Sequence, residues 1–140
     1  MPSGTAASLS REQMVLCLDT TFLADLLSSR PAAVEFAASV HEPAVVSAVS
    51  FYELLWGALG QRRLGRVESF RREYAVLPAD YGVCALAATL QRTLLDGGGR
   101  IPDFDAIIAA TALLADATVV TRDTHFARVP ARFALRAIAY

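Results

Sequence analysis

Short apolar runs alternate with helical patterns along this chain. Val15–Leu18 is a brief apolar run, and TTFLADLL after it carries apolar residues at helical spacing. The run AVVSAV at 44–49 lacks polar alternation, which is typical of a strand covered on both faces. Further strands are indicated at 117–121 and 134–140. Strands that alternate with helices predict a three-layer α/β fold with a parallel sheet.

Helices are predicted between these strands, and several have recognisable ends. Ser47 or Ser50 can cap the helix after the second strand, and Asp80 can cap a long apolar helix. Asp103 or a neighbour can cap another, after a break at the three glycines 97–99. The predicted helical ranges are 20–27, 31–41, 50–59, 61–74, 81–95, 106–115 and a short one within 122–129.

Composition restricts the class of protein. A chain of 140 residues is the size of one domain, and its 54% hydrophobic and 19% charged residues exclude intrinsic disorder. The longest uncharged stretch, at 81–91, has 11 residues, against about 20 for a membrane-spanning helix. We therefore expect no membrane segment, and we expect the surplus apolar surface to meet a partner or a second copy.

The net charge, the cysteines and the N-terminal residues restrict the possible functions only slightly. The net charge of −1 excludes a globally basic nucleic-acid binder but leaves room for a local basic face. Cys17 and Cys84 lie in apolar strings, which argues against a zinc site or a disulfide framework and favours the cytoplasm. Residues 1–13 lack signal-peptide features and are interpreted as a disordered extension or a vector-derived segment before a domain at 14–140.

Four acidic residues follow the predicted strands or begin the helices after them. They are Asp19, Glu53, Asp105 and Asp123. Singly, Asp19 and Asp105 have an ordinary explanation as helix-start residues, and Asp123 as a turn residue. Glu53 lies among large apolar neighbours, so a solvated helix face explains it poorly. Because the carboxyl ends of parallel strands share one edge, we expect all four to meet in one cleft.

Converging carboxylates call for a cation. Two carboxylates 4 Å apart repel by about 4 kcal/mol at an effective dielectric constant near 20. Carboxylate and water ligands suit Mg²⁺ or Mn²⁺, which are commonly bound together with a substrate phosphate. Such a metal activates water and neutralises charge on a phosphodiester, so the pattern favours nuclease chemistry.

Three blocks of sequence carry a family resemblance. LDTTFLADLL, VSAVSFYELLWGAL and DAIIAATALLADATVVTRDTHF closely resemble the PIN-domain endoribonucleases, and among them the VapC-type toxins of prokaryotic toxin–antitoxin pairs. The resemblance spans residues 14–140. By position it assigns the metal-binding, catalytic acids to Asp19, Glu53, Asp105 and the more variable Asp123.

The resemblance also implies a fold and partners. It implies a parallel sheet of about five strands flanked by helices, and Mg²⁺- or Mn²⁺-dependent cleavage of RNA that leaves a 5′-phosphate and a 3′-hydroxyl. It further implies a homodimer and neutralisation by a cognate antitoxin. Two other hypotheses are a non-catalytic PIN-like scaffold for RNA or an antitoxin, and a domain phosphorylated on Asp19. The single acid in LDTT disfavours the last, because such phosphatases show a D-x-D pair.

Several neighbouring residues have open or lesser roles. Asp103 is interpreted as a capping residue, and Thr20 and Thr121 either orient carboxylates or satisfy backbone groups. His125 is expected to be exposed or at a helix end, and the metal needs no histidine base.

Two predicted helix surfaces also have more than one interpretation. The helix at 61–74 has five arginines and two glutamates, and either grips RNA phosphates or an acidic antitoxin segment, or is a solvated face with pairs such as Glu68 and Arg72. Phe51, Tyr52 and Trp56 are interpreted as packing or dimer-contact residues.

Overall fold

The computed structural model describes residues 14–140, so the interpretation of residues 1–13 lies outside the described part of the chain. Each element has the following bounds. The strands are β1 (Val15–Leu18), β2 (Ala44–Ser47), β3 (Ala75–Leu77), β4 (Ala117–Val120) and β5 (Arg136–Ile138). The helices are α2 (Thr20–Leu27), α3 (Pro31–Ser39), α4 (Ala48–Gly57), α5 (Gln61–Glu73), α6 (Tyr81–Asp96) and α7 (Asp103–Leu114), with short 3₁₀ turns η1 (Thr124–Arg128) and η2 (Ala131–Phe133).

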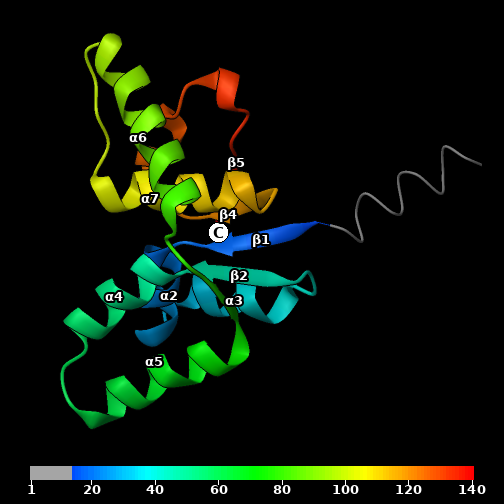
Figure 1. The fold of residues 1–140 in the computed structure, drawn as a ribbon. Helices are drawn as coiled ribbons and strands as arrows, with labels where there is room; N and C mark the ends of the chain where they lie inside the picture. Colours follow the sequence, from blue (N-terminus) through cyan, green and yellow to red (C-terminus); the bar gives the residue numbers. More distant parts are fainter. Residues whose placement is uncertain (1–13) are drawn as a thin grey trace, which may run out of the picture.

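The five strands form one parallel sheet in the order β3-β2-β1-β4-β5 (Figure 1). The chain builds outward from β1 through β2 to β3, and then returns to place β4 on the other side of β1. This confirms the predicted parallel α/β fold. The reversal of strand order beside β1 is a topological switch point, where parallel α/β proteins gather ligands beyond the carboxyl ends of the strands.

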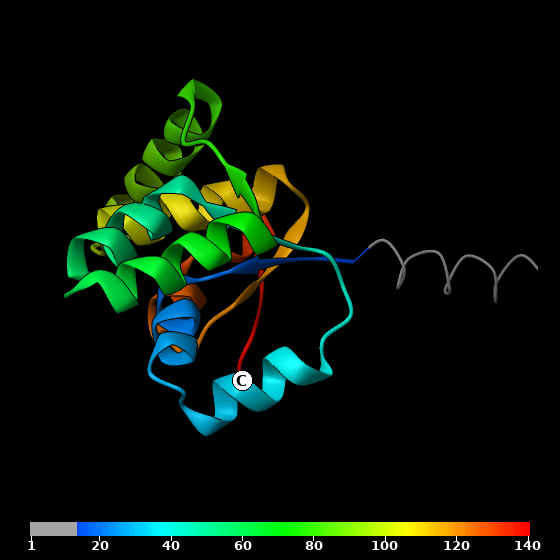
Figure 2. The ribbon, with the colours of Figure 1, turned by 90° about the horizontal axis from the view of Figure 1, so that it is seen from below.

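The central strands are buried on both faces. Leu16 and Leu18 join a core with α2, whereas Cys17 between them joins a core with α6 and α7. Figure 2 shows α2 and α3 on one side of β1, and α6 and α7 on the other. This double burial explains the continuous apolar runs, because both alternating sets of side chains face helices.

Helix starts follow local capping chemistry in two of the three predicted cases. The Ser47 side chain accepts a hydrogen bond from the Val49 amide, so α4 begins at Ala48, two residues earlier than expected. Asp80 caps α6 by accepting from the Val83 amide. The capping role expected of Asp103 is wrong: α7 begins at Asp103 itself, whose exposed carboxylate accepts from Arg100 at 2.6 Å.

The side chain of Gln91 fixes the approach to α7. Its Nε2 donates to the Ile101 carbonyl at 2.6 Å, and its Oε1 accepts from the Ile101 amide at 3.2 Å. Ile101 is itself buried. The start of α7 is therefore held against α6 after the three-glycine break, and this places the first turn of α7 at the edge of the sheet.

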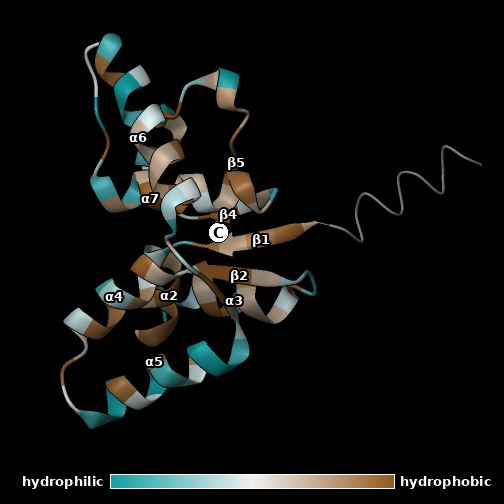
Figure 3. Cartoon of the chain, viewed as in Figure 1, coloured by the Kyte–Doolittle hydropathy of each residue, from teal (hydrophilic) through white to brown (hydrophobic). Residues whose placement is uncertain are grey.

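The outer surfaces are mixed in character. None of the helices within residues 14–140 combines the length and apolar character of a membrane-spanning segment. Phe51 is buried as expected, whereas Tyr52 and Trp56 on the same helix are exposed. On α5, Arg71 and not Arg72 pairs with Glu68, at 2.8 Å. Figure 3 shows α5 largely hydrophilic and the loop that joins it to α4 hydrophobic.

Candidate metal centre

Asp19 occupies the switch point of the sheet. It follows β1 directly, and its backbone amide donates to the Val120 carbonyl at the end of β4. Its side chain caps α2 by accepting from the Thr20 amide at 2.8 Å. β1 and β4 together thus fix Asp19 at the carboxyl edge of the sheet.

The Asp19 carboxylate is buried but richly supplied with hydrogen-bond donors. It is 1% exposed. The hydroxyl groups of Thr21 and Thr121 each donate to its Oδ2 at 2.7 Å. A buried carboxylate that accepts this many hydrogen bonds keeps much of the stabilisation that water would give its charged form.

The loop after β4 carries the next acid. Thr121 accepts a hydrogen bond from the Asp123 amide at 2.9 Å, while its own hydroxyl donates to Asp19. The Asp123 carboxylate then accepts from the His125 amide at 2.8 Å and so caps η1. Thr121 therefore links the acid after β1 to the acid after β4, as one of its two predicted roles requires.

Asp105 approaches from the first turn of α7. Its Oδ2 lies 2.8 Å from His125 Nδ1, and the same nitrogen lies 3.0 Å from Asp123 Oδ1. Asp105, Asp123 and His125 each offer one donor atom, and these atoms lie within 4.8 Å of one another. Two segments, the start of α7 and the start of η1, thus converge on one half-buried cluster, although Asp105 and His125 lie 20 positions apart in sequence.

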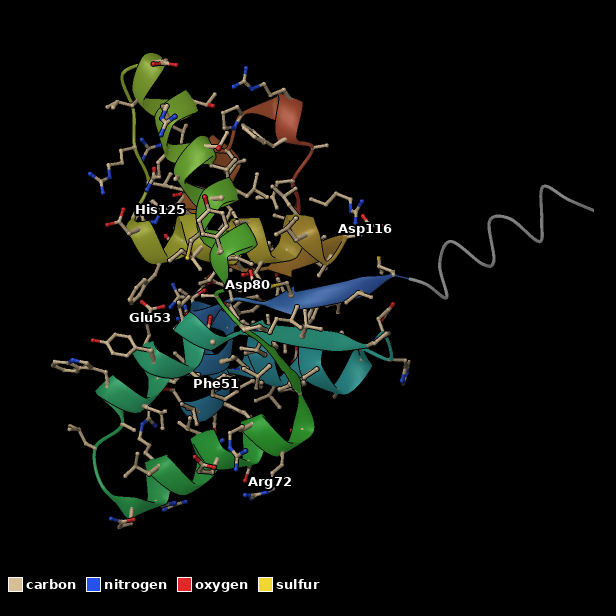
Figure 4. All side chains as sticks on the ribbon, viewed as in Figure 1. Phe51, Glu53, Arg72, Asp80, Asp116 and His125 are labelled. Carbon is tan, nitrogen blue, oxygen red and sulfur yellow. The ribbon has the colours of Figure 1, made fainter. Side chains whose placement is uncertain are left out.

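Glu53 reaches this region through a hydroxyl group and not by direct contact. The Thr20 hydroxyl donates to Glu53 Oε1 at 2.7 Å, and lies 2.9 Å from the Ser50 hydroxyl. Figure 4 shows Glu53 and His125 at the same end of the molecule, the end to which β1 points, and Asp116 at the opposite end. Thr20 follows Asp19 in the chain, so Glu53 lies beside the cluster but outside its tightest group.

The electrostatics of the cluster disfavour charge on its acids. Burial raises the pKa of Asp19, the hydrogen bonds from Thr121, Thr21 and Thr20 oppose that rise, and the charge of Asp123 adds to it. Burial also raises the pKa of Asp105 to about 6, against the hydrogen bond from His125 and together with the charges of Asp19 and Asp123. The carboxylates therefore repel one another, and a cation among them would relieve that repulsion.

Three residues of this region make contacts that the sequence did not indicate. His125 lies within the short helix η1, at a helix end as expected, and its half-buried ring also lies against Asp105 and Asp123, a contact that the sequence did not indicate. Thr21 was not singled out, and Ser50 was named only as an alternative helix cap. The only local signal for Thr21 is the paired threonine after Asp19, and for His125 its place two residues beyond Asp123.

The donor chemistry of the cluster fits a hard divalent cation. Its ligand atoms are carboxylate oxygens and one imidazole nitrogen, and its support comes from threonine hydroxyl groups. Oxygen-rich sites of this kind suit Mg²⁺ or Mn²⁺, and an imidazole is also compatible with Mn²⁺. Asp105, Asp123, His125 and the adjoining Asp19 are the residues that could hold it.

Fold and site together define a class: a parallel α/β domain with a carboxylate cluster at its switch point. The family model of the PIN domain matches residues 16–132, and the chain belongs to the PIN domain family. This confirms the family resemblance found in the sequence. The comparison with curated proteins gives no match.

Solved structures share this fold over nearly the whole chain. A chain of VapBC2 from Rickettsia felis, crystallised with promoter DNA, matches with a TM-score of 0.79 and 18% identity, covering 91% of this chain and 99% of that one. A chain of DNA-bound VapBC from Salmonella typhimurium gives 0.77 and 23%, covering 90% and 98%. VapC20 from Mycobacterium tuberculosis, described as a toxin that cleaves the sarcin-ricin loop, gives 0.67 and 19%, covering 80% and 92%.

Proposed function

We propose that this protein is a Mg²⁺- or Mn²⁺-dependent endoribonuclease and the toxin of a toxin–antitoxin pair. The observation that carries the proposal is the meeting of Asp105, Asp123 and His125 within 4.8 Å beside the buried Asp19. Membership of the PIN domain family supports it, as does the likeness in fold to VapC20, a toxin described as cleaving the sarcin-ricin loop.

The carboxylates divide the work of the site. Asp19, Asp105 and Asp123 would hold the cation, with Asp105 contributed by the first turn of α7 and Asp123 by the loop after β4. A bound cation would supply polarisation of the phosphodiester and a lower pKa for the attacking water molecule. Glu53, directed by the Thr20 hydroxyl, extends the negative surface toward α4.

The supporting side chains oppose the protonation of these acids and orient them. Thr21 and Thr121 hold Asp19 Oδ2 with two hydroxyl donors. The contact of His125 favours the charged form of Asp105. Supporting hydrogen bonds of this kind often change metal affinity by about 10- to 100-fold.

The partners follow from the same proposal. The substrate is an RNA strand whose scissile phosphate reaches the cluster. The solved relatives from Rickettsia felis and Salmonella typhimurium are VapBC complexes, which supports a cognate antitoxin for this chain. We further propose that the protein acts in the cytoplasm as a homodimer, with residues 14–140 as one PIN domain.

The test is cleavage of a mixed RNA pool by the purified protein with Mn²⁺ and with chelator. We expect cleavage with Mn²⁺ only, and a loss of at least about 100-fold in Asp105→Asn. Asp103→Asn is the matched control, because Asp103 lies in the same helical turn but is exposed and paired with Arg100. Full activity of a folded Asp105→Asn protein would overturn the assignment of Asp105.

The second candidate, a non-catalytic scaffold, makes the opposite prediction. Such a protein would have the same fold and would bind RNA or an antitoxin. Its RNA would not be cleaved on addition of Mn²⁺, and chelator would have no effect on cleavage. The hydroxyl groups that donate to the buried Asp19 carboxylate favour the catalytic proposal, because they oppose the rise in its pKa and a scaffold has no need to keep a carboxylate buried.

A further inference from the structure

A groove leads away from the carboxylate cluster toward α5. Its first part, a hollow of about 150 Å³, is lined by Thr20 and Glu53 at one end and by Leu27 and Arg63 at the other. A second hollow, of about 430 Å³, shares Leu27 and Arg63 and continues to further arginines of α5. Because the two hollows share lining residues, they form one path, which we call the arginine groove.

Three arginines give this groove its charge. They are Arg62, Arg63 and Arg66. None of the three pairs with a carboxylate within the part of the chain that the structure describes. Elsewhere on α5, Arg71 is paired with Glu68. The positive charge of the groove is therefore available to a ligand.

Two of these arginines are already held in place. Arg63 donates to the Leu27 carbonyl and to the Ser28 hydroxyl, and Arg66 donates to the carbonyls of Leu26 and Leu27. These bonds also satisfy the carbonyl end of α2, which is a structural role. A guanidinium has five N–H donors, so each retains donors for a bound phosphate.

Arg62 has no such structural role. It is exposed, and within residues 14–140 its side chain forms no ion pair or hydrogen bond. It nevertheless lines the same hollow as Arg63 and Arg66. Helix capping therefore explains two of the arginines and leaves the third, and the alignment of all three along one groove, without a structural cause.

We propose that the arginine groove binds the sugar-phosphate backbone of single-stranded RNA next to the phosphodiester at the carboxylate cluster. This inference rests on the proposed function and adds where the rest of the substrate lies. A nucleic-acid strand matches the groove because one phosphate meets the cation among the carboxylates while the following phosphates meet arginines. An acidic peptide would also pair with the arginines, but it would supply no phosphodiester to the carboxylate cluster at the near end.

The test compares two charge reversals on α5 in an Asp105→Asn background, which binds without cleaving. Arg62→Glu alters the groove, and Arg72→Glu makes the same change in net charge near the end of α5 that leads into β3, away from Glu53 (Figure 4). Binding of a short single-stranded RNA is measured by fluorescence anisotropy over a series of salt concentrations. We expect Arg62→Glu to weaken RNA binding about tenfold at low salt and to reduce the slope of affinity against salt by about one phosphate contact. Arg72→Glu should weaken RNA binding by less than about twofold.

Equal losses in the two variants would overturn the proposal, because they would indicate a general effect of net charge. Unchanged RNA binding by Arg62→Glu, together with weaker binding of a polyglutamate peptide, would assign the groove to a protein partner instead. Cleavage by the protein with its native Asp105, run in parallel with Mn²⁺, keeps the two proposals separate. If it cuts RNA and Arg62→Glu has no effect, only the groove is refuted; if it cuts nothing while Arg62 still governs RNA binding, only the nuclease is refuted.

Discussion

Arg122 donates two hydrogen bonds, of 2.6 and 3.2 Å, to the carboxylate of Asp25, which lies 97 positions earlier in the sequence. The Tyr140 hydroxyl donates to the same carboxylate, whose pKa is lowered chiefly by the hydrogen bond from Arg122. Asp25 belongs to α2, which begins just after Asp19, and Arg122 directly precedes Asp123. The pair thus ties together the two segments that carry acids on either side of the switch point.

We expect Asp25→Asn to lower the free energy of unfolding by about 1.5 to 3 kcal/mol, because it weakens charge-assisted hydrogen bonds to Arg122. It should also weaken Mn²⁺ binding, since the loop that carries Asp123 loses its anchor. Chemical denaturation and a Mn²⁺ titration measure the two effects. Asp116→Asn is the control, because its pair with Arg136 is exposed, and we expect a change within about 0.5 kcal/mol. Equal effects of both substitutions would contradict the anchoring role.

The metal-free protein should lose stability as pH rises through the acidic range. Asp105 keeps its proton up to about pH 6 in the folded protein, whereas an ordinary aspartate releases it near pH 4. Between these values the folded state binds more protons than the unfolded chain, so the free energy of unfolding falls with rising pH. Asp105→Asn should remove that part of the slope and stabilise the metal-free protein at pH 7.5 by about 1 to 2 kcal/mol.

Denaturation in the presence of chelator, at pH 5 and at pH 7.5, measures this difference. Asp103→Asn again serves as the control, because that carboxylate is exposed and its pKa is lowered by Arg100. An Asp105→Asn protein with the same pH slope as the unsubstituted chain would show that Asp105 does not titrate in this range.

Thr121→Val should impair the site while leaving the fold intact. Valine has nearly the same shape but no hydroxyl, so Asp19 loses one of its two hydroxyl donors and Asp123 loses an acceptor for its amide. The pKa of Asp19 then rises further, and we expect cation affinity to fall by about 10- to 100-fold. Thr89→Val, on the exposed side of α6, controls for loss of a hydroxyl. Unchanged Mn²⁺ affinity in Thr121→Val would show that the hydroxyl bridge is dispensable.

His125→Ala tests the imidazole contact with the acids. The hydrogen bond from His125 lowers the pKa of Asp105, so its removal lets protons compete more strongly for that carboxylate. We expect Mn²⁺ affinity to fall about 10-fold or more, and the loss to be larger at pH 6 than at pH 8. His41→Ala, at an exposed position, should change neither value. A loss that is the same at both pH values would mean that His125 does not act through the protonation of Asp105.

Local chemistry explains which parts of the fold were predictable from the sequence. β1, β2 and β4 are apolar runs between helical patterns, and Ser47 and Asp80 cap the helices they precede. β3 was not located, because two of its three residues are exposed and its apolar run is only three residues long. Its place in the sheet depends on pairing with β2, which is a contact between distant segments.

The candidate site, too, was predictable only in part from the sequence. The four acids could be chosen because strand ends and helix starts are visible in the sequence, and parallel topology brings such positions together. The contact between His125 and Asp105 spans 20 positions, and that between Thr20 and Glu53 spans 33. Neither follows from spacing, because each depends on how α4, α7 and η1 pack around the sheet.

The two outermost strands, β3 and β5, have three residues each. Edge strands this short expose few unpaired amide and carbonyl groups, so they offer another polypeptide few backbone hydrogen bonds. Growth of the sheet from one molecule into the next is thereby discouraged. We therefore expect any dimer of this chain to be held together by contacts between helix side chains, and each copy to keep its own separate sheet.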